Sequence, residues 1–184
     1  MVYATFLLCV VSACSCNNED RYVKEIKQLI GRNITFPLGC QVIPQEDSCI
    51  IQAYIKETEK IVTYMDDFPC TECGINAMRD CSNYVKSMDA NVTYIIVVHT
   101  DDENNFKNIF RTSMMDVPIV FYSTKIFGEK NNLNVLARNK TFLLDSSNRI
   151  VLVGEPWMNK KMTSLYQRAI MALRKLHKPN VEIE

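Results

Sequence analysis

The sequence predicts one α/β domain built on a central mixed β-sheet flanked by helices, with a short β-containing extension on its N-terminal side. Its 184 residues suit a single domain with a proper core. From Lys60 onward, short β-rich runs alternate with stretches of helical periodicity. The last two β-rich runs are separated only by a turn sequence, so they pair antiparallel and make the sheet mixed.

The first part of the predicted domain alternates strands and helices. Residues 61–65 are rich in β-branched and aromatic side chains, as in a strand. Residues 71–88 place Ile75, Met78, Cys81 and Val85 on one helical face. The continuous apolar run 92–98 is typical of a strand buried on both faces. A helix over 102–114 and a strand over 118–122 follow.

The remaining segments are assigned by the same patterns. Residues 125–138 suggest a short helix and loop, and residues 145–148 form a turn between strands 141–144 and 150–153. Helices are expected at 19–30 and 158–176, strands at 34–36 and 50–54, and a loop at 38–49. The order β-α-β-α-β, then hairpin, then helix, is that of the thioredoxin fold.

Charge and hydropathy exclude two classes of protein. Lys and Arg number 21, as do Asp and Glu, and a balanced chain lacks the cationic excess of a nucleic-acid binder. Apolar runs stay shorter than the roughly 18–20 residues that span a bilayer.

The N-terminal segment has the character of an export signal. Residues 1–13 are uncharged and mostly apolar, and they end in Val11-Ser12-Ala13 before Cys14. This step resembles the lipobox of bacterial lipoproteins, which implies a lipid on Cys14, a tether over 14–20 and a bilayer as partner. A buried N-terminal strand or helix is the alternative. The resemblance implies a cell-envelope lipoprotein, facing the periplasm or displayed on the surface.

The cysteines indicate chemistry at one point of the chain. Cys70-Thr71-Glu72-Cys73 lies where a predicted strand turns into a helix, and unpaired N–H groups at a helix N-terminus stabilise a thiolate. We therefore predict Cys70 as nucleophile and Cys73 as resolving thiol, with a structural disulfide or a metal as alternatives. No paired CxxC or Cys/His spacing of a zinc site is present, and we expect no metal and no cofactor.

Other residues have two interpretations each. Cys40 and Cys49 close a short loop by a disulfide, or both stay unpaired. Cys81 is a buried thiol or a third redox partner. His99 is a cap or surface residue, or else a base. Trp157 anchors the last helix by packing, or binds a ligand.

Residues 61–173 resemble the TlpA-like and redoxin-like thioredoxin-fold lipoproteins common in Bacteroidetes. The matching pieces are 61–66, the CxxC of residues 70–73, the hairpin 141–154, His99 at a strand end, and 159–161. Ile34-Thr35-Phe36-Pro37 resembles the strand preceding the domain. We therefore expect a lipoprotein signal peptide over 1–13, a tether over 14–20, an N-terminal extension over 21–59, a thioredoxin-like domain over 60–177 and a tail over 178–184.

Two positions depart from the family pattern. Pro69 stands where most thioredoxins have Trp, and Lys140, within Asn139-Lys140-Thr141, stands where they have a cis-Pro. A non-Pro cis bond costs about 2.5–4 kcal/mol, so a trans loop with altered substrate docking is expected. If that loop faces the CxxC, Lys140 supports the Cys70 thiolate and favours acidic substrates; otherwise it is a solvated lysine.

Three functions follow from these expectations. The first is an envelope thiol–disulfide oxidoreductase, with disulfides or thiols of exported proteins as substrates and a membrane electron donor. The second is a peroxiredoxin-like peroxidase. The third is a non-catalytic thioredoxin-fold module that binds a partner at the envelope.

Overall fold

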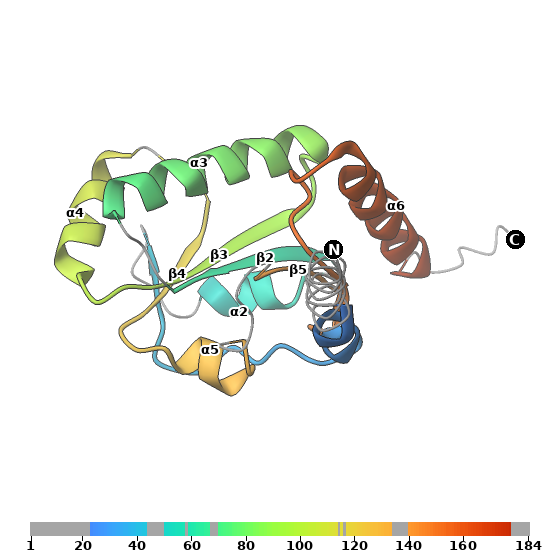
Figure 1. Cartoon of the computed structure of the whole chain (residues 1–184), viewed down its shortest axis with the longest axis horizontal. Coiled ribbons are helices and arrows are strands. Elements are labelled where there is room, and N and C mark those ends of the chain that lie inside the picture. Colours follow the sequence, from blue (N-terminus) through green and yellow to red (C-terminus); the bar gives the residue numbers. More distant parts are fainter. Residues whose placement is uncertain are drawn as a thin grey trace, which may run out of the picture.

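A six-stranded mixed sheet forms the centre of the computed structural model, which describes residues 23–43, 50–57, 59–66, 70–113, 115, 117–133 and 140–177 (Figure 1). The strands are β1 (Gln41–Ile43), β2 (Lys60–Met65), β3 (Thr93–His99), β4 (Ile119–Tyr122), β5 (Thr141–Leu144) and β6 (Ile150–Val153). Their order in the sheet is β1-β4-β3-β2-β5-β6. β2, β3 and β4 run parallel, whereas β1, β5 and β6 pair antiparallel. The mixed sheet confirms the predicted fold class.

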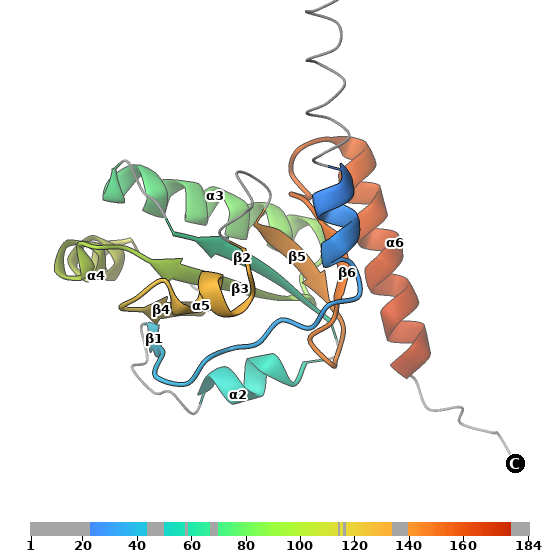
Figure 2. The same ribbon diagram turned by 60° about the horizontal axis from the view of Figure 1, so that its bottom comes forward.

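Helices cover both faces of this sheet. They are α2 (Ile50–Ile55), α3 (Thr71–Met88), α4 (Glu103–Thr112), α5 (Ile126–Lys130) and α6 (Lys160–His177), and residues 23–29 are also helical. Helices α3, α4 and α6 pack on one face, while α2, α5 and the 23–29 helix pack on the other (Figure 2). The domain therefore has three layers.

The side chains of β3 alternate between the two hydrophobic cores, one on each face of the sheet. Tyr94, Ile96 and Val98 join the core beneath α3, α4 and α6, while Ile95 and Val97 join the core on the other side. Successive side chains of a strand point to opposite faces. A continuous apolar run is therefore the correct pattern for a strand covered on both sides, as predicted.

The N-terminal region differs from the expectation. Residues 50–55 form helix α2 rather than a strand, and its Tyr54 and Ile55 pack against the core. Residues 41–43 form β1 within the expected loop, because Gln41 pairs with Phe121 at the free edge of β4. Residues 34–36 are not a strand; Ile34 is buried, and its N–H donates to the carbonyl of Asn148.

Strand β2 positions the thiols. It lies inside the sheet, between parallel β3 and antiparallel β5. Helix α3 begins shortly after β2 ends, so its N-terminus lies at the carboxyl ends of the parallel strands. No helix in the described ranges is long and apolar enough to cross a membrane.

Candidate functional site

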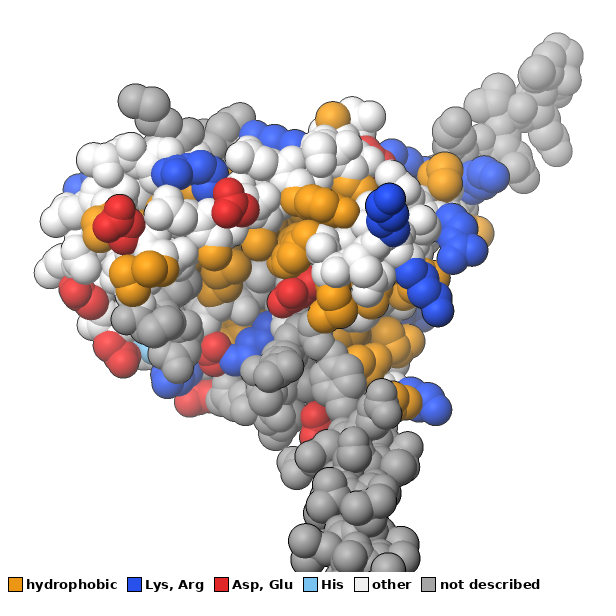
Figure 3. Space-filling view, turned by 45° about the horizontal axis from the view of Figure 1, so that its top comes forward, with side chains coloured by type: hydrophobic (Ala, Val, Ile, Leu, Met, Phe, Trp, Pro, Cys, Tyr) orange, Lys and Arg blue, Asp and Glu red, His pale blue; other side chains and the backbone are white. Residues whose placement is uncertain are grey.

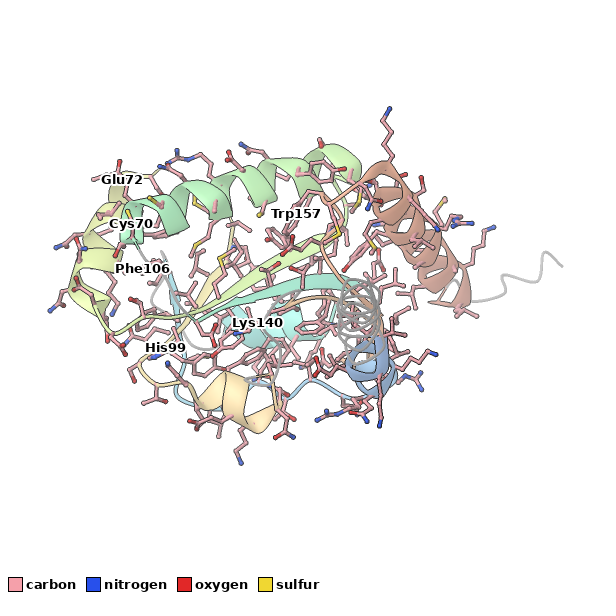
Figure 4. The ribbon with its side chains drawn as sticks, in the orientation of Figure 1. Cys70, Glu72, His99, Phe106, Lys140 and Trp157 are labelled. Carbon is pink, nitrogen blue, oxygen red and sulfur yellow. The ribbon has the colours of Figure 1, made fainter. Side chains whose placement is uncertain are left out.

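Cys70 is the N-cap residue of α3. Its backbone is extended, with φ −153° and ψ 122°, and its Sγ accepts a hydrogen bond from the Cys73 backbone N–H at 3.3 Å. A cap side chain satisfies one of the N–H groups that a helix start leaves unpaired. Both cysteines are exposed free thiols, at the end of α3 labelled in Figure 4. Pro69 lies outside the described residues.

The two thiols have opposite tendencies to ionise. The pKa of Cys70 is lowered, first by the hydrogen bond from the Cys73 side chain and then by the backbone N–H groups of Cys73 and Glu72. The pKa of Cys73 is raised, first by its hydrogen bond to Cys70 and then by the charge of the Cys70 sulfur. The Glu72 carboxylate opposes ionisation of both. Cys70 is therefore the thiol that ionises first, while Cys73 keeps its proton.

The loop before β5 lies against the end of β2. The carbonyl of Lys140 accepts a hydrogen bond from the Tyr64 N–H at 2.8 Å, which extends the β2–β5 ladder. The Lys140 ammonium binds Asp66 Oδ1 at 2.5 Å and lies 5.3 Å from the centroid of the Tyr64 ring. Asn139 is outside the described residues.

This placement corrects the expectation for Lys140. The ammonium is neither solvated nor directed at the Cys70 sulfur; it forms a half-buried ion pair with Asp66. The physical reason is the partner: the Asp66 carboxylate, directly after β2, lies within ion-pair distance of the ammonium. Asp66 is a site residue that the sequence patterns missed, although its position directly after an apolar strand marks the sheet edge that bears the thiols.

Thr141 belongs to a buried hydroxyl chain rather than to an open substrate-facing surface. Its Oγ1 lies 3.1 Å from Thr63 Oγ1, and the hydroxyl of Tyr94 donates to Thr63 Oγ1 at 3.1 Å. These three residues come from β5, β2 and β3 and are all buried. The chain joins the three strands below α3.

The remaining described cysteines are poor nucleophiles. Partial burial raises the pKa of Cys81 to about 12, and its side chain is intermediate in exposure rather than fully buried. Burial also raises the pKa of Cys40. Cys40 is a free thiol in the core, and its disulfide with Cys49 stays a prediction because that residue is not described. Cys49 and Cys14 lie outside the described residues.

His99 and Trp157 have mainly structural contacts. His99 is buried, contrary to a surface position; its Nδ1 lies 3.2 Å from the Tyr122 carbonyl oxygen and its Nε2 3.5 Å from Asp101 Oδ1. Trp157 meets Tyr84 edge to face at 6.4 Å and packs on the core below α6, as the packing alternative required.

Among the described residues, no group of three or more His, Cys, Asp and Glu side chains is arranged to hold a metal ion.

Solved structures of similar shape share the fold at low sequence identity. Peroxiredoxin Q of Xanthomonas campestris is 14% identical, with a TM-score of 0.52 over 78% of this chain and 96% of that one. The thioredoxin domain of a thiol-disulfide oxidoreductase from Bacteroides vulgatus is 11% identical, with a TM-score of 0.52 over 77% and 97%. An uncharacterised conserved protein of Geobacillus kaustophilus is 11% identical, with a TM-score of 0.51 over 71% and 70%.

The sequence matches no protein-family profile, and no curated protein is similar to it at a significant level. The likeness is therefore one of fold: a mixed sheet of matching shape, with helices on both faces. The chain has a thioredoxin-like fold.

Proposed function

We propose that this chain is a thiol–disulfide oxidoreductase that acts through Cys70 and Cys73 on exported proteins. The observation that carries the proposal is the arrangement at the start of α3, where two exposed free thiols lie three residues apart and the Cys73 N–H donates to Cys70 Sγ. This arrangement lowers the pKa of Cys70 and raises that of Cys73. An exchange enzyme needs one thiol ionised for attack and a second held in reserve as a proton-bearing thiol. The exposure of both sulfurs leaves room for a protein substrate.

The reaction follows from these roles. The Cys70 thiolate attacks one sulfur of a substrate disulfide, a mixed disulfide forms, and the other substrate sulfur leaves as a thiolate that takes up a proton. Cys73 then loses its proton and attacks Cys70 Sγ, which releases the second substrate thiolate. Two electrons pass to the substrate, and the Cys70–Cys73 disulfide that results is reduced again by a membrane-bound dithiol donor.

The test is to trap the intermediate. A Cys73→Ser variant incubated with a fluorescent peptide disulfide should accumulate a mixed disulfide on Cys70, identified by mass spectrometry. A Cys70→Ser variant is the matched control and should give none. Equal labelling of both variants, or a wild-type pair that does not cycle in glutathione buffers, would favour the non-catalytic binding module.

A peroxidase is the second candidate, favoured by the likeness of the fold to peroxiredoxin Q. In that case the Cys70 thiolate attacks the peroxide oxygen, forms a sulfenic acid and releases water or an alcohol. Peroxide consumption with dithiothreitol as reductant, measured for wild type and Cys70→Ser, distinguishes the two. The oxidoreductase proposal requires peptide-disulfide exchange to be much faster than peroxide consumption.

Attachment to the cell envelope is the remaining part of the proposal. It is supported by the sequence Val11-Ser12-Ala13-Cys14 after an uncharged apolar run. In a bacterial host, the wild-type chain should incorporate a radioactive fatty acid and fractionate with membranes. Cys14→Ser should abolish the label, and a variant that keeps it would rule out Cys14 as the lipid site.

A further inference from the structure

The exposed apolar side chains of the described residues gather on two helical segments. Large apolar residues with high exposure are Val23, Ile30, Leu38, Met158, Met171 and Leu176, and all except Leu38 belong to residues 23–30 or 158–176. Leu176 is the most exposed of these five, at 79%. Large apolar side chains that cluster at the surface mark an interaction site more often than single ones do.

Basic side chains share the exposed side of α6. The helix contains five Lys and Arg residues and no acidic residue. Lys161, Arg168 and Lys175 follow one another at intervals of seven, so they form one row along the exposed face, and all three are exposed. Met171 lies next to this row, one turn from Arg168 and from Lys175. Arg174 is different, because it binds Glu59 and Asp89.

The segment 23–32 has the same character. It contributes exposed Lys24, Lys27 and Arg32 against one acidic residue, Glu25. Figures 1 and 2 both place the 23–29 helix and α6 at the same end of the molecule, and Figure 2 labels β6 between them. In Figure 3, Lys and Arg side chains with apolar ones between them crowd the right-hand end, and acidic side chains lie mainly toward the left.

We propose that the exposed sides of α6 and of residues 23–32, here named the basic end, dock on an anionic lipid bilayer. Apolar side chains among Lys and Arg suit the boundary between lipid head groups and acyl chains. The apolar side chains insert there, and the Lys and Arg side chains meet the lipid phosphates. The core of a protein–protein interface is depleted of charged residues, whereas here Lys and Arg lie among the apolar side chains.

The position of the predicted lipid site along the chain agrees with docking through the basic end. Cys14, the predicted lipid site, precedes Val23 by nine residues, so an acyl anchor would enter the domain at the basic end. Cys70 lies at the opposite end of α3 from α6 (Figure 4). Docking therefore turns the thiols away from the lipid and toward the aqueous phase. This surface interaction is independent of disulfide exchange and of lipidation.

Vesicle sedimentation tests the proposal with the full chain carrying Cys14→Ser, so that no lipid is attached. The vesicles contain phosphatidylcholine alone or with about one third phosphatidylglycerol. Binding should require the anionic lipid and fall as salt screens the charges. The triple variant Lys161→Gln, Arg168→Gln, Lys175→Gln should bind about 100-fold more weakly, since each cation at an anionic surface contributes about fivefold.

A matched variant controls for loss of charge alone. Lys56→Gln, Lys125→Gln, Lys130→Gln removes three exposed lysines elsewhere and should bind as the parent does. Likewise Leu176→Ser should weaken binding while Leu38→Ser should not. Equal binding to neutral vesicles, or equal loss in both triple variants, would overturn the proposal. So would light scattering that shows a dimer broken by Met171→Ser, with vesicle binding unchanged.

Discussion

At the scale of single residues, the ionisation of Cys70 depends mainly on its neighbour three positions later. The Cys73 side chain and backbone both donate to the Cys70 sulfur, and the Glu72 N–H adds to them. These donors stabilise the thiolate and not the thiol, so they lower the pKa of Cys70. The setting needs no cation, which is consistent with the engagement of Lys140 elsewhere.

Replacing the Cys73 thiol tests this dependence. Cys73→Ala removes the side-chain donor, so the midpoint of Cys70 alkylation against pH should rise toward that of a free thiol, about 8.5. Cys73→Ser keeps a hydroxyl donor and should give a smaller rise. The measurement is the rate of iodoacetamide labelling of Cys70, followed by peptide mass spectrometry. Identical midpoints in wild type and Cys73→Ala would show that Cys73 does not stabilise the thiolate.

The ion pair between Lys140 and Asp66 predicts an effect on stability and not on Cys70. The two side chains are 18% and 16% exposed, so removing one charge leaves the other poorly solvated. Lys140→Met should lower the free energy of unfolding by about 1–3 kcal/mol, measured in urea, with the Cys70 alkylation midpoint unchanged. Adding Asp66→Asn should recover part of the loss, and a raised Cys70 midpoint would restore a role for Lys140 at the thiolate.

At the scale of elements, Arg174 fixes α6 to the rest of the domain. Its guanidinium binds Glu59, just before β2, and both oxygens of Asp89, just after α3, the latter at 2.8 and 3.3 Å. One side chain thereby joins α6, β2 and α3. Two carboxylates on one guanidinium use the planar fork that lysine lacks.

Loss of this clamp should weaken the fold. Arg174→Met keeps most of the apolar stem but removes the charge, and Glu59 is only 5% exposed. The free energy of unfolding should fall by about 1–3 kcal/mol. Lys175→Met, at the next and exposed position, is the control and should change it by less than about 0.5 kcal/mol. Equal values for the two variants in urea denaturation would contradict the clamp.

The sequence was sufficient for elements with strong local patterns and insufficient where a distant partner decides. The apolar run of β3, the periodic face of α3 and the turn between β5 and β6 were predicted close to their observed bounds. Strand β1 was missed because only its pairing with β4, some 80 residues away, makes it a strand. Residues 50–55 were assigned to the wrong class because short apolar runs do not distinguish helix from strand.

The same limit applies to the site. A CxxC at a strand-to-helix junction places Cys70 at the cap of α3, and local hydrogen bonds then follow. The partner of Lys140 could not be inferred, because Asp66 is 74 residues distant and only the register of β2 against β5 brings the two together. The chemical roles of Cys70 and Cys73 stay predictions until exchange is measured.

At the scale of the whole molecule, one buried lysine makes the free energy of unfolding vary with pH in the alkaline range. Lys60 is fully buried, and its Nζ donates to the carbonyls of Glu57 at 2.8 Å and Asp145 at 2.9 Å. Burial lowers its pKa to about 8, against 10.5 when unperturbed. Between these values the unfolded chain binds more protons than the folded one, so stability rises with pH across that window.

The comparison with Lys60→Met isolates this effect. Between pH 7.5 and 10.5, the free energy of unfolding of wild type should gain about 3 kcal/mol relative to the variant. Tyrosine and cysteine side chains titrate in both proteins, so their contributions to the free energy of unfolding cancel in the difference. Urea denaturation at four or five pH values gives the measurement, and a constant difference across the range would show that Lys60 keeps its proton in the folded state.

The position of β2 between β3 and β5 has a consequence for folding during synthesis on the ribosome. Thr63 pairs with Thr141, so one edge of β2 has no partner until almost 80 further residues have left the ribosome. Pairing over such a separation closes late. During that interval Cys40, which the finished fold buries, and Cys81, which it leaves partly exposed, are open to oxidation beside Cys70 and Cys73. An oxidising compartment would then offer the nascent chain several wrong disulfides, and the interval in which they can form closes only after β5 has been made and has paired with β2.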